Sequence, residues 1–167
     1  MKKFNYLAIL LFLMAVPVFF SSCGDDDDLI PEEKQEQVMK EWVEPFHVRN
    51  ATVEEVKAYM DSSMTDYQLS AETSGSDHIQ LAYSASNGNV GILYSFSALS
   101  GQLYSVIDTE LCINSSVIID YLSEHYTFVS SDKTTLQYCF TTPDKSLVVT
   151  TVKISDSCFN INYSFVY

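Results

Sequence analysis

The chain has little basic charge. Nine lysines and arginines stand against 22 aspartates and glutamates, which gives a formal net charge of −13. An acidic surface of this kind repels nucleic acid and anionic lipid headgroups. Nucleic-acid binding is therefore excluded as a function.

The sequence also lacks the common catalytic motifs. Only five glycines occur in 167 residues, and neither a phosphate-cradling glycine loop nor a Gly-x-Ser-x-Gly elbow is present. No Cys-x-x-Cys or mixed Cys/His spacing indicates a metal site. We therefore predict no catalytic residues, no metal and no cofactor, and we keep an unrecognised hydrolase as a minor alternative.

Three histidines, His47, His78 and His125, lie in the C-terminal part of the chain. His125 ends a predicted helix, where a cation interacts favourably with the helix dipole, so we favour a structural role for it. The serines are numerous, but the sequence alone gives no reason to pair one of them with a histidine.

The apolar run near the N-terminus is too short for a membrane-spanning helix, which needs about 20 residues. It extends over residues 7–20, follows Lys2 and Lys3, and ends in small residues. A charged start, a short apolar middle and small residues at the end are typical of a secretory signal peptide. We predict such a peptide at residues 1–22.

The residues that end this run are Phe20-Ser21-Ser22-Cys23. They resemble the lipobox that lipoprotein signal peptidase reads. The resemblance implies cleavage before Cys23, diacylglycerol on its sulfur and a further acyl chain, such as palmitate, on the new amine. Several acyl chains anchor a protein stably, so the first predicted partner is a membrane. The alternative is an incidental cysteine in a cleaved leader.

Gly24 and the acidic run Asp25–Asp28 follow the cysteine. This order resembles the leader of Bacteroidetes lipoproteins, in which an acidic run directs export to the cell surface. Gly24 departs from that pattern, which usually has Lys or Gln before the acids. The resemblance implies an outer-membrane location, on the cell surface or the periplasmic face. A solvated spacer, kept extended by self-repulsion, explains the same acids.

Residues 23–45 are predicted to form an acidic tether, with a few helical turns from Pro31 to Trp42. Removal of the leader would leave 145 residues with a net charge of −15. The tether would precede one globular domain at residues 46–167. The cysteines of this domain, Cys112, Cys139 and Cys158, are odd in number and cannot all pair with one another. We expect Cys139 to be a buried free thiol, because it lies in an apolar strand pattern.

The domain shows two similar halves, at residues 50–112 and 113–167. The first begins with a helix over residues 53–62, which the capping-box spacing of Thr52 and Glu55 indicates. Strands with alternating apolar residues follow, and Asn87-Gly88 predicts a hairpin between two of them. The second half repeats this order after cap candidates at Asn114-Ser115-Ser116.

The two halves match at particular residues. Tyr59-Met60 and Tyr67 correspond to Tyr121-Leu122 and Tyr126, and residues 79–83 correspond to residues 136–140. We predict an α+β fold in which two tandem helix-plus-four-strand units form a curved antiparallel sheet with both helices on one face. This order resembles TBP-like and beta-lactamase-inhibitor-protein-like folds, over residues 50–167.

Aromatic residues are abundant, with eleven tyrosines and ten phenylalanines. Trp42 and Tyr104 are the candidates for an interaction surface: Tyr104 would lie on the open sheet face if Leu103 points inward. Tyrosine on such a face suits recognition of a protein or a glycan. The predicted function is therefore a non-catalytic binding module at the cell envelope. A structural or assembly lipoprotein is the main alternative, and a merely solvated face is equally compatible with the sequence.

Overall fold

The computed structural model describes residues 39–86 and 90–166. The predicted signal peptide, Cys23 and the predicted tether up to residue 38 lie outside these ranges. The described helices and strands are, in chain order, α2 (Val53–Ser63), β1 (Tyr67–Ser74), β2 (His78–Ala85), β3 (Gly91–Ser97), β4 (Leu103–Leu111), the 3-10 turn η2 (Cys112–Asn114), α3 (Ser115–His125), β5 (Thr127–Asp132), β6 (Gln137–Thr141), β7 (Leu147–Lys153) and β8 (Cys158–Phe165).

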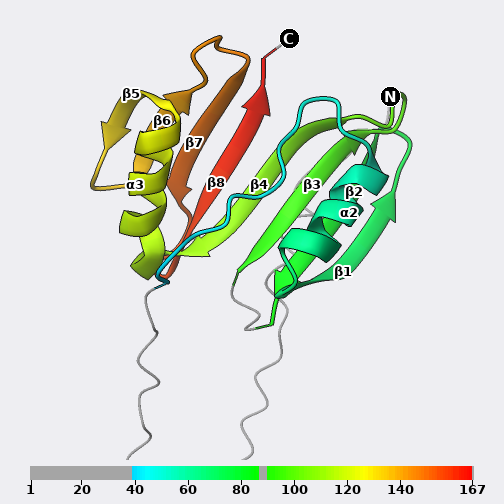
Figure 1. Ribbon diagram of the computed structural model, residues 1–167, viewed down its shortest axis with the longest axis horizontal. Helices are drawn as coiled ribbons and strands as arrows, with labels where there is room; N and C mark the ends of the chain where they lie inside the picture. The colour runs from blue at the N-terminus through cyan, green and yellow to red at the C-terminus, as the bar shows by residue number, and fades with distance from the viewer. Residues whose placement is uncertain (1–38, 87–89, 167) are drawn as a thin grey trace, which may run out of the picture. The chain divides into compact units, whose positions relative to one another are not determined.

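The strands form one eight-stranded antiparallel sheet in the order β1-β2-β3-β4-β8-β7-β6-β5. Strands β4 and β8 pair at its centre, and β1 and β5 are its edges. Both helices lie over the same face of the sheet (Figure 1). The predicted α+β class with an antiparallel sheet is confirmed.

Helix α2 begins where the capping box predicts. The Thr52 side chain accepts a hydrogen bond from the backbone of Glu55, and the Glu55 carboxylate accepts from the backbone of Thr52 at 2.8 Å. Its buried residues, Val56 and Met60, are four apart and so lie on one helix face.

Helix α3 buries Ile118 and Leu122 at the same spacing. Asn114 lies at its N-cap but makes no capping hydrogen bond. Its side-chain oxygen instead accepts from the backbone N–H of Met39 at 3.0 Å. The residue therefore ties the start of the domain to the helix, rather than capping the helix as predicted.

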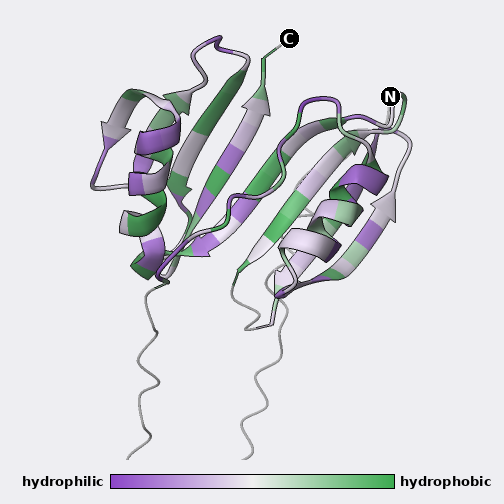
Figure 2. Cartoon of the chain, viewed as in Figure 1, coloured by the Kyte–Doolittle hydropathy of each residue, from purple (hydrophilic) through white to green (hydrophobic). Residues whose placement is uncertain are grey.

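Alternation along the strands sorts side chains between the two faces (Figure 2). One row of opposed residues crosses the inner face, beneath the helices. It runs Leu81, Tyr94, Val106, Tyr163, Val149 and Phe140. All six are fully buried and belong to one core cluster with the apolar helix residues.

The segment of residues 39–48 passes between α2 and α3 (Figure 1, cyan). It is not helical, so the helix predicted as far as Trp42 does not reach that residue in the described chain. Trp42 is 4% exposed and packs edge-on against Tyr121, with ring centroids 5.2 Å apart. Burial of this indole holds the segment on the domain, which therefore begins before the predicted boundary at residue 46.

The hairpin residues Asn87 and Gly88 lie outside the described ranges, but the strands that they connect, β2 and β3, pair antiparallel. Gly91 begins β3 and pairs with Ser84 of β2. A Cβ atom there would come within 2.6 Å of the Tyr83 carbonyl oxygen. This position therefore requires glycine.

Candidate functional site

No helix of the described chain covers the sheet face opposite α2 and α3. We call this face the open face. The strand register gives three rows of residues on this face. They are Thr73-Gln80-Ser95-Ser105-Ser164-Val148-Thr141, Ala71-Ala82-Leu93-Ile107-Asn162-Thr150-Cys139-Ser130 and Gln68-Ser84-Gly91-Thr109-Asn160-Val152. None of these residues is charged, although the whole chain carries a net charge of −13.

Many polar side chains on this face are paired with one another. Ser84 donates to Ser70 at 3.1 Å, and the Gln80 amide donates to Ser95 at 3.4 Å. Nearer the centre of the sheet, Thr109 donates to the Asn160 side chain at 2.9 Å. These pairs bridge neighbouring strands and reduce the hydrogen-bonding capacity that is left for a ligand.

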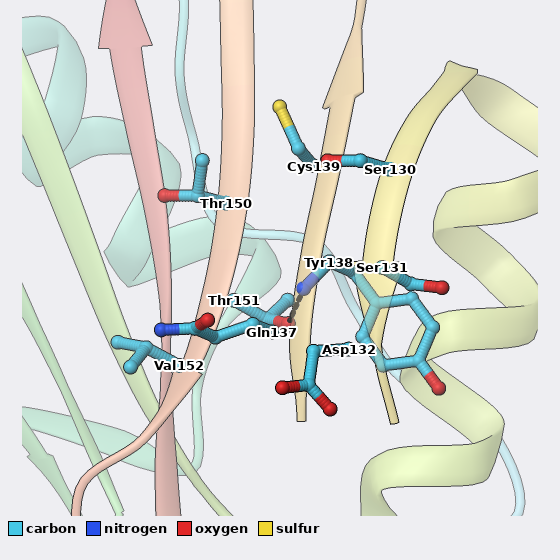
Figure 3. A pocket seen from close by; sticks show the side chains of 9 residues that line it. All are labelled: Ser130, Ser131, Asp132, Gln137, Tyr138, Cys139, Thr150, Thr151 and Val152. Atoms are coloured by element: carbon cyan, nitrogen blue, oxygen red, sulfur yellow. Dashed lines mark hydrogen bonds between the residues drawn. The ribbon is translucent and has the colours of Figure 1, made fainter. Parts of the chain in front are cut away.

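Strands β5, β6 and β7 form a hollow of about 450 Å3 towards the other edge of the sheet (Figure 3). Its lining consists of Ser130, Ser131, Asp132, Gln137, Tyr138, Cys139, Thr150, Thr151 and Val152. Polar side chains dominate this lining, and Asp132 contributes the one carboxylate. The volume lies within the range of about 300–1,000 Å3 that small-molecule sites occupy.

Asp132 is held in place at the rim of the hollow. One of its carboxylate oxygens accepts from the backbone N–H of Thr134 at 2.9 Å. Asp132 also pairs with Gln137 across the β5–β6 ladder, so a carboxylate and a primary amide belong to neighbouring positions of the lining. Both groups are planar and carry two polar atoms, which suits them to paired hydrogen bonds with a ligand.

Cys139 faces this hollow and is only half-buried, whereas the sequence predicted a buried thiol. The prediction followed from its apolar neighbours along β6. Those neighbours alternate: Tyr138 and Phe140 point to the core, and Cys139 points to the open face.

The two predicted surface residues lie in different environments. Tyr104 is 41% exposed and falls in the bulge between the pairs Ser95–Ser105 and Phe96–Leu103, with Leu103 directed into the core. Trp42 is buried between the helix and the sheet, so its side chain offers no surface to a partner in this conformation.

A second polar cluster lies on the inner side of the domain, around Glu44. One carboxylate oxygen accepts from Tyr126 at 2.6 Å and from Tyr163 at 3.0 Å, and the other accepts from Tyr121 at 3.3 Å. Tyr59 donates to the Glu44 backbone carbonyl at 3.0 Å. Burial raises the pKa of Tyr163, and the Glu44 charge raises it further, so this hydroxyl remains a protonated donor.

Asp108 and Glu110 form an unexpected acidic pair on the inner face of β4. They are 0% and 2% exposed. Neither oxygen of Asp108 and only one oxygen of Glu110 has a hydrogen-bond partner among the described residues, the donor being Tyr67 at 3.4 Å. Burial raises the pKa of Asp108 well above its ordinary value, and the Glu110 charge adds to this effect.

Burial likewise raises the pKa of Glu110 to about 7, against the opposing influence of the Tyr67 hydroxyl. The indole N–H of Trp42 is close enough to lower the pKa of both acids, but its nitrogen does not reach hydrogen-bond geometry with either. This pair was not predicted from the sequence. The available signal was the alternation of β4, which places both acids in phase with Val106.

The three histidines lie on three different segments of the domain. His125 lies in the last turn of α3, as predicted, stacks on Tyr121 and has Nδ1 2.8 Å from the Tyr121 carbonyl oxygen. His47 Nε2 is 3.0 Å from the Tyr126 hydroxyl. His78 begins β2. Within residues 39–86 and 90–166, none of the three has a hydrogen bond to a serine hydroxyl.

Two further observations concern the described residues only. They contain no group of three or more His, Cys, Asp or Glu side chains arranged to hold a metal ion. No helix among them has the length and apolar character needed to cross a membrane.

Comparison with protein-family models, curated proteins and solved structures finds no match to this chain.

Proposed function

We propose that this chain is a lipid-anchored protein of the cell envelope and acts as a non-catalytic binding module for a protein or glycan partner. The observation that carries the binding role is the open sheet face. It extends over the eight strands, and its three central rows contain no charged residue. These rows therefore offer polar and apolar side chains to a partner, in a protein whose net charge is strongly negative.

The membrane location of this proposal rests on the N-terminal sequence. Residues 20–23 supply the lipobox-like end of the leader, and Asp25–Asp28 supply the acidic run. We place the protein in the outer membrane, at the cell surface or on the periplasmic face. The tether after Cys23 would hold the open face within reach of other envelope components.

The same proposal includes a tandem origin for the domain, from units at residues 50–112 and 113–167. The strand order reads as two runs of four that meet at β4 and β8, and each run follows one 11-residue helix. The buried helix residues Val56 and Met60 precede their counterparts Ile118 and Leu122 by 62 positions in each case. Two such units would cover a sheet face that one unit leaves exposed.

The binding role is tested by crosslinking and pull-down from intact cells, in which the full-length chain carries an affinity tag. Ser164→Arg places a long charged side chain in a central strand of the open face. Ser62→Arg makes the same change at an exposed position in the last turn of α2, on the opposite side of the sheet. We expect wild type and Ser62→Arg to capture the same partner and Ser164→Arg to lose it.

Equal capture by all three proteins would overturn the assignment of the open face. Protease shaving of whole cells then gives the orientation: cleavage of the protein in intact cells indicates the surface, and protection indicates the periplasmic face.

A further inference from the structure

The hollow on β5–β7 gathers several unused hydrogen-bonding groups in one place on the open face. Figure 3 marks a hydrogen bond between the Tyr138 backbone and Thr151, at 3.1 Å. Within the described chain, the side chains of Ser130, Gln137 and Thr150 make no hydrogen bond. By contrast, Gln80 and Asn160 on the same face are paired with neighbouring strands.

These groups converge from three adjacent strands. Ser130 on β5 lies opposite Cys139 on β6, and Cys139 lies opposite Thr150 on β7. Figure 3 shows Gln137 and Asp132 beside one another at the lower end of the hollow, with Val152 on the β7 side. The lining thus presents hydroxyls, one amide, one carboxylate and one aliphatic side chain to the same space.

The charge of the site restricts the ligand. The chain is strongly acidic and the hollow itself contains Asp132, so anionic ligands are disfavoured. A single exposed carboxylate contributes little to holding a cation, because solvent screens the pair. A neutral ligand with many hydroxyl groups suits the available donors and acceptors best.

We propose that the hollow binds a neutral sugar residue of a glycan. The adjacent carboxylate and amide of Asp132 and Gln137 would each engage two neighbouring sugar hydroxyls, since each has two polar atoms in one plane. The Ser130 and Thr150 hydroxyls both donate and accept, and the methyl groups of Val152 would contact the C–H face of the ring. This inference rests on the proposed binding function and names the ligand class for part of the same face.

The test is a titration followed by NMR. The 15N-labelled chain from residue 23 onward, with Cys23→Ser to keep it in solution, is titrated with glucose, galactose, mannose and N-acetylglucosamine, and with glucuronic acid as the charged comparison. We expect at least one neutral sugar to shift the resonances of Gln137 and Thr150 saturably and more strongly than glucuronic acid does.

Two variants and a matched control locate the site. Gln137→Leu and the nearly isosteric Thr150→Val remove hydrogen-bonding groups from the hollow, and each should weaken binding by roughly tenfold. Gln80→Leu makes the same change on the same face, outside the hollow, and should leave the affinity within about twofold, since it removes no contact to the sugar. The amide spectrum of each variant reports whether its fold is intact.

The inference is overturned if no neutral sugar shifts the resonances of the hollow residues, or if glucuronic acid binds as tightly as the neutral sugars. It is also overturned if both hollow variants bind the sugar with the affinity of wild type. Failure here is distinguishable from failure of the proposed function. If Ser164→Arg still abolishes capture of a protein partner while no sugar binds, the open face keeps its binding role and only the sugar assignment is lost.

Discussion

Asp108 and Glu110 occupy positions on β4 that the alternation of the strand would normally give to apolar side chains. They lie on the same face of β4 as Val106, near the tyrosines of the core, and among the described residues neither forms an ion pair with a lysine or arginine. A buried carboxyl without a cation favours its protonated form. This pair therefore links the stability of the domain to pH.

The sign of this dependence follows from Glu110, whose pKa of about 7 in the folded protein lies above the value of about 4.3 expected for an unfolded chain. Between these values the unfolded chain loses the proton while the folded protein keeps it, so stability falls as pH rises. Glu110→Gln lacks this titration. As pH rises from about 4 to about 8, we expect its free energy of unfolding to increase relative to that of wild type by roughly 3 kcal/mol.

Urea denaturation across this pH range measures the difference. The matched control is Glu124→Gln, which makes the same change at an exposed position on α3. An identical pH dependence in wild type and Glu110→Gln would show that Glu110 is not the buried, protonated group described.

At the scale of elements, the segment of residues 39–48 acts as part of the core although it is neither helix nor strand. It contributes the buried Trp42 and the Glu44 carboxylate, which accepts hydrogen bonds from three tyrosines. Tyr121 belongs to α3, Tyr126 follows that helix and Tyr163 lies on β8. The segment therefore links α3 to the centre of the sheet.

Removal of the chain before residue 46, with Trp42 and Glu44, should destabilise the domain severely. We compare the chain at residues 36–167, which forms one compact unit, with the chain at residues 46–167. Loss of a buried tryptophan alone costs about 3–5 kcal/mol, and a whole domain is stable by only about 5–15 kcal/mol. We expect the shorter chain to show no cooperative unfolding transition when urea denaturation is monitored by circular dichroism.

Leu99→Ala in the longer chain is the control, because Leu99 is 98% exposed and its truncation should change stability by less than about 0.5 kcal/mol. If residues 46–167 unfolded at the same urea concentration as residues 36–167, the segment would be an accessory rather than a part of the core.

The sequence predicts those elements whose side chains alternate. In β8, Phe159, Ile161 and Tyr163 are buried and Asn160 and Asn162 face the open side, because a period of two directly encodes the two faces of a sheet. Helix α2 was equally predictable, since its capping box and apolar spacing are local signals.

Features that depend on distant pairing were not predictable. The hollow requires β5, β6 and β7 to be neighbours with Ser130, Cys139 and Thr150 in register, and a single sequence does not give register. Residues 39–48 have no periodicity, so their path between the two helices (Figure 1) was not predictable. Asp108 and Glu110 were visible as acids in phase with Val106, but only once the limits of β4 were known.

At the scale of the whole molecule, two helices and a crossing segment cover the inner face of the sheet (Figure 1), and no helix of the described chain covers the outer face. The proposed binding role requires that the chain reach the envelope and stay there. That requirement depends on Cys23, which lies outside the described residues, and on residues 24–38 that connect it to the domain.

The most direct test is mass spectrometry of the N-terminal peptide of the protein purified from the membrane fraction, beside the Cys23→Ala variant. We predict that the wild-type peptide begins at Cys23 and carries diacylglycerol on sulfur and an acyl chain on the amine, while Cys23→Ala accumulates as an uncut precursor without palmitate. An unmodified Cys23, or a Cys23→Ala protein that is processed and membrane-bound like wild type, would contradict lipid anchoring.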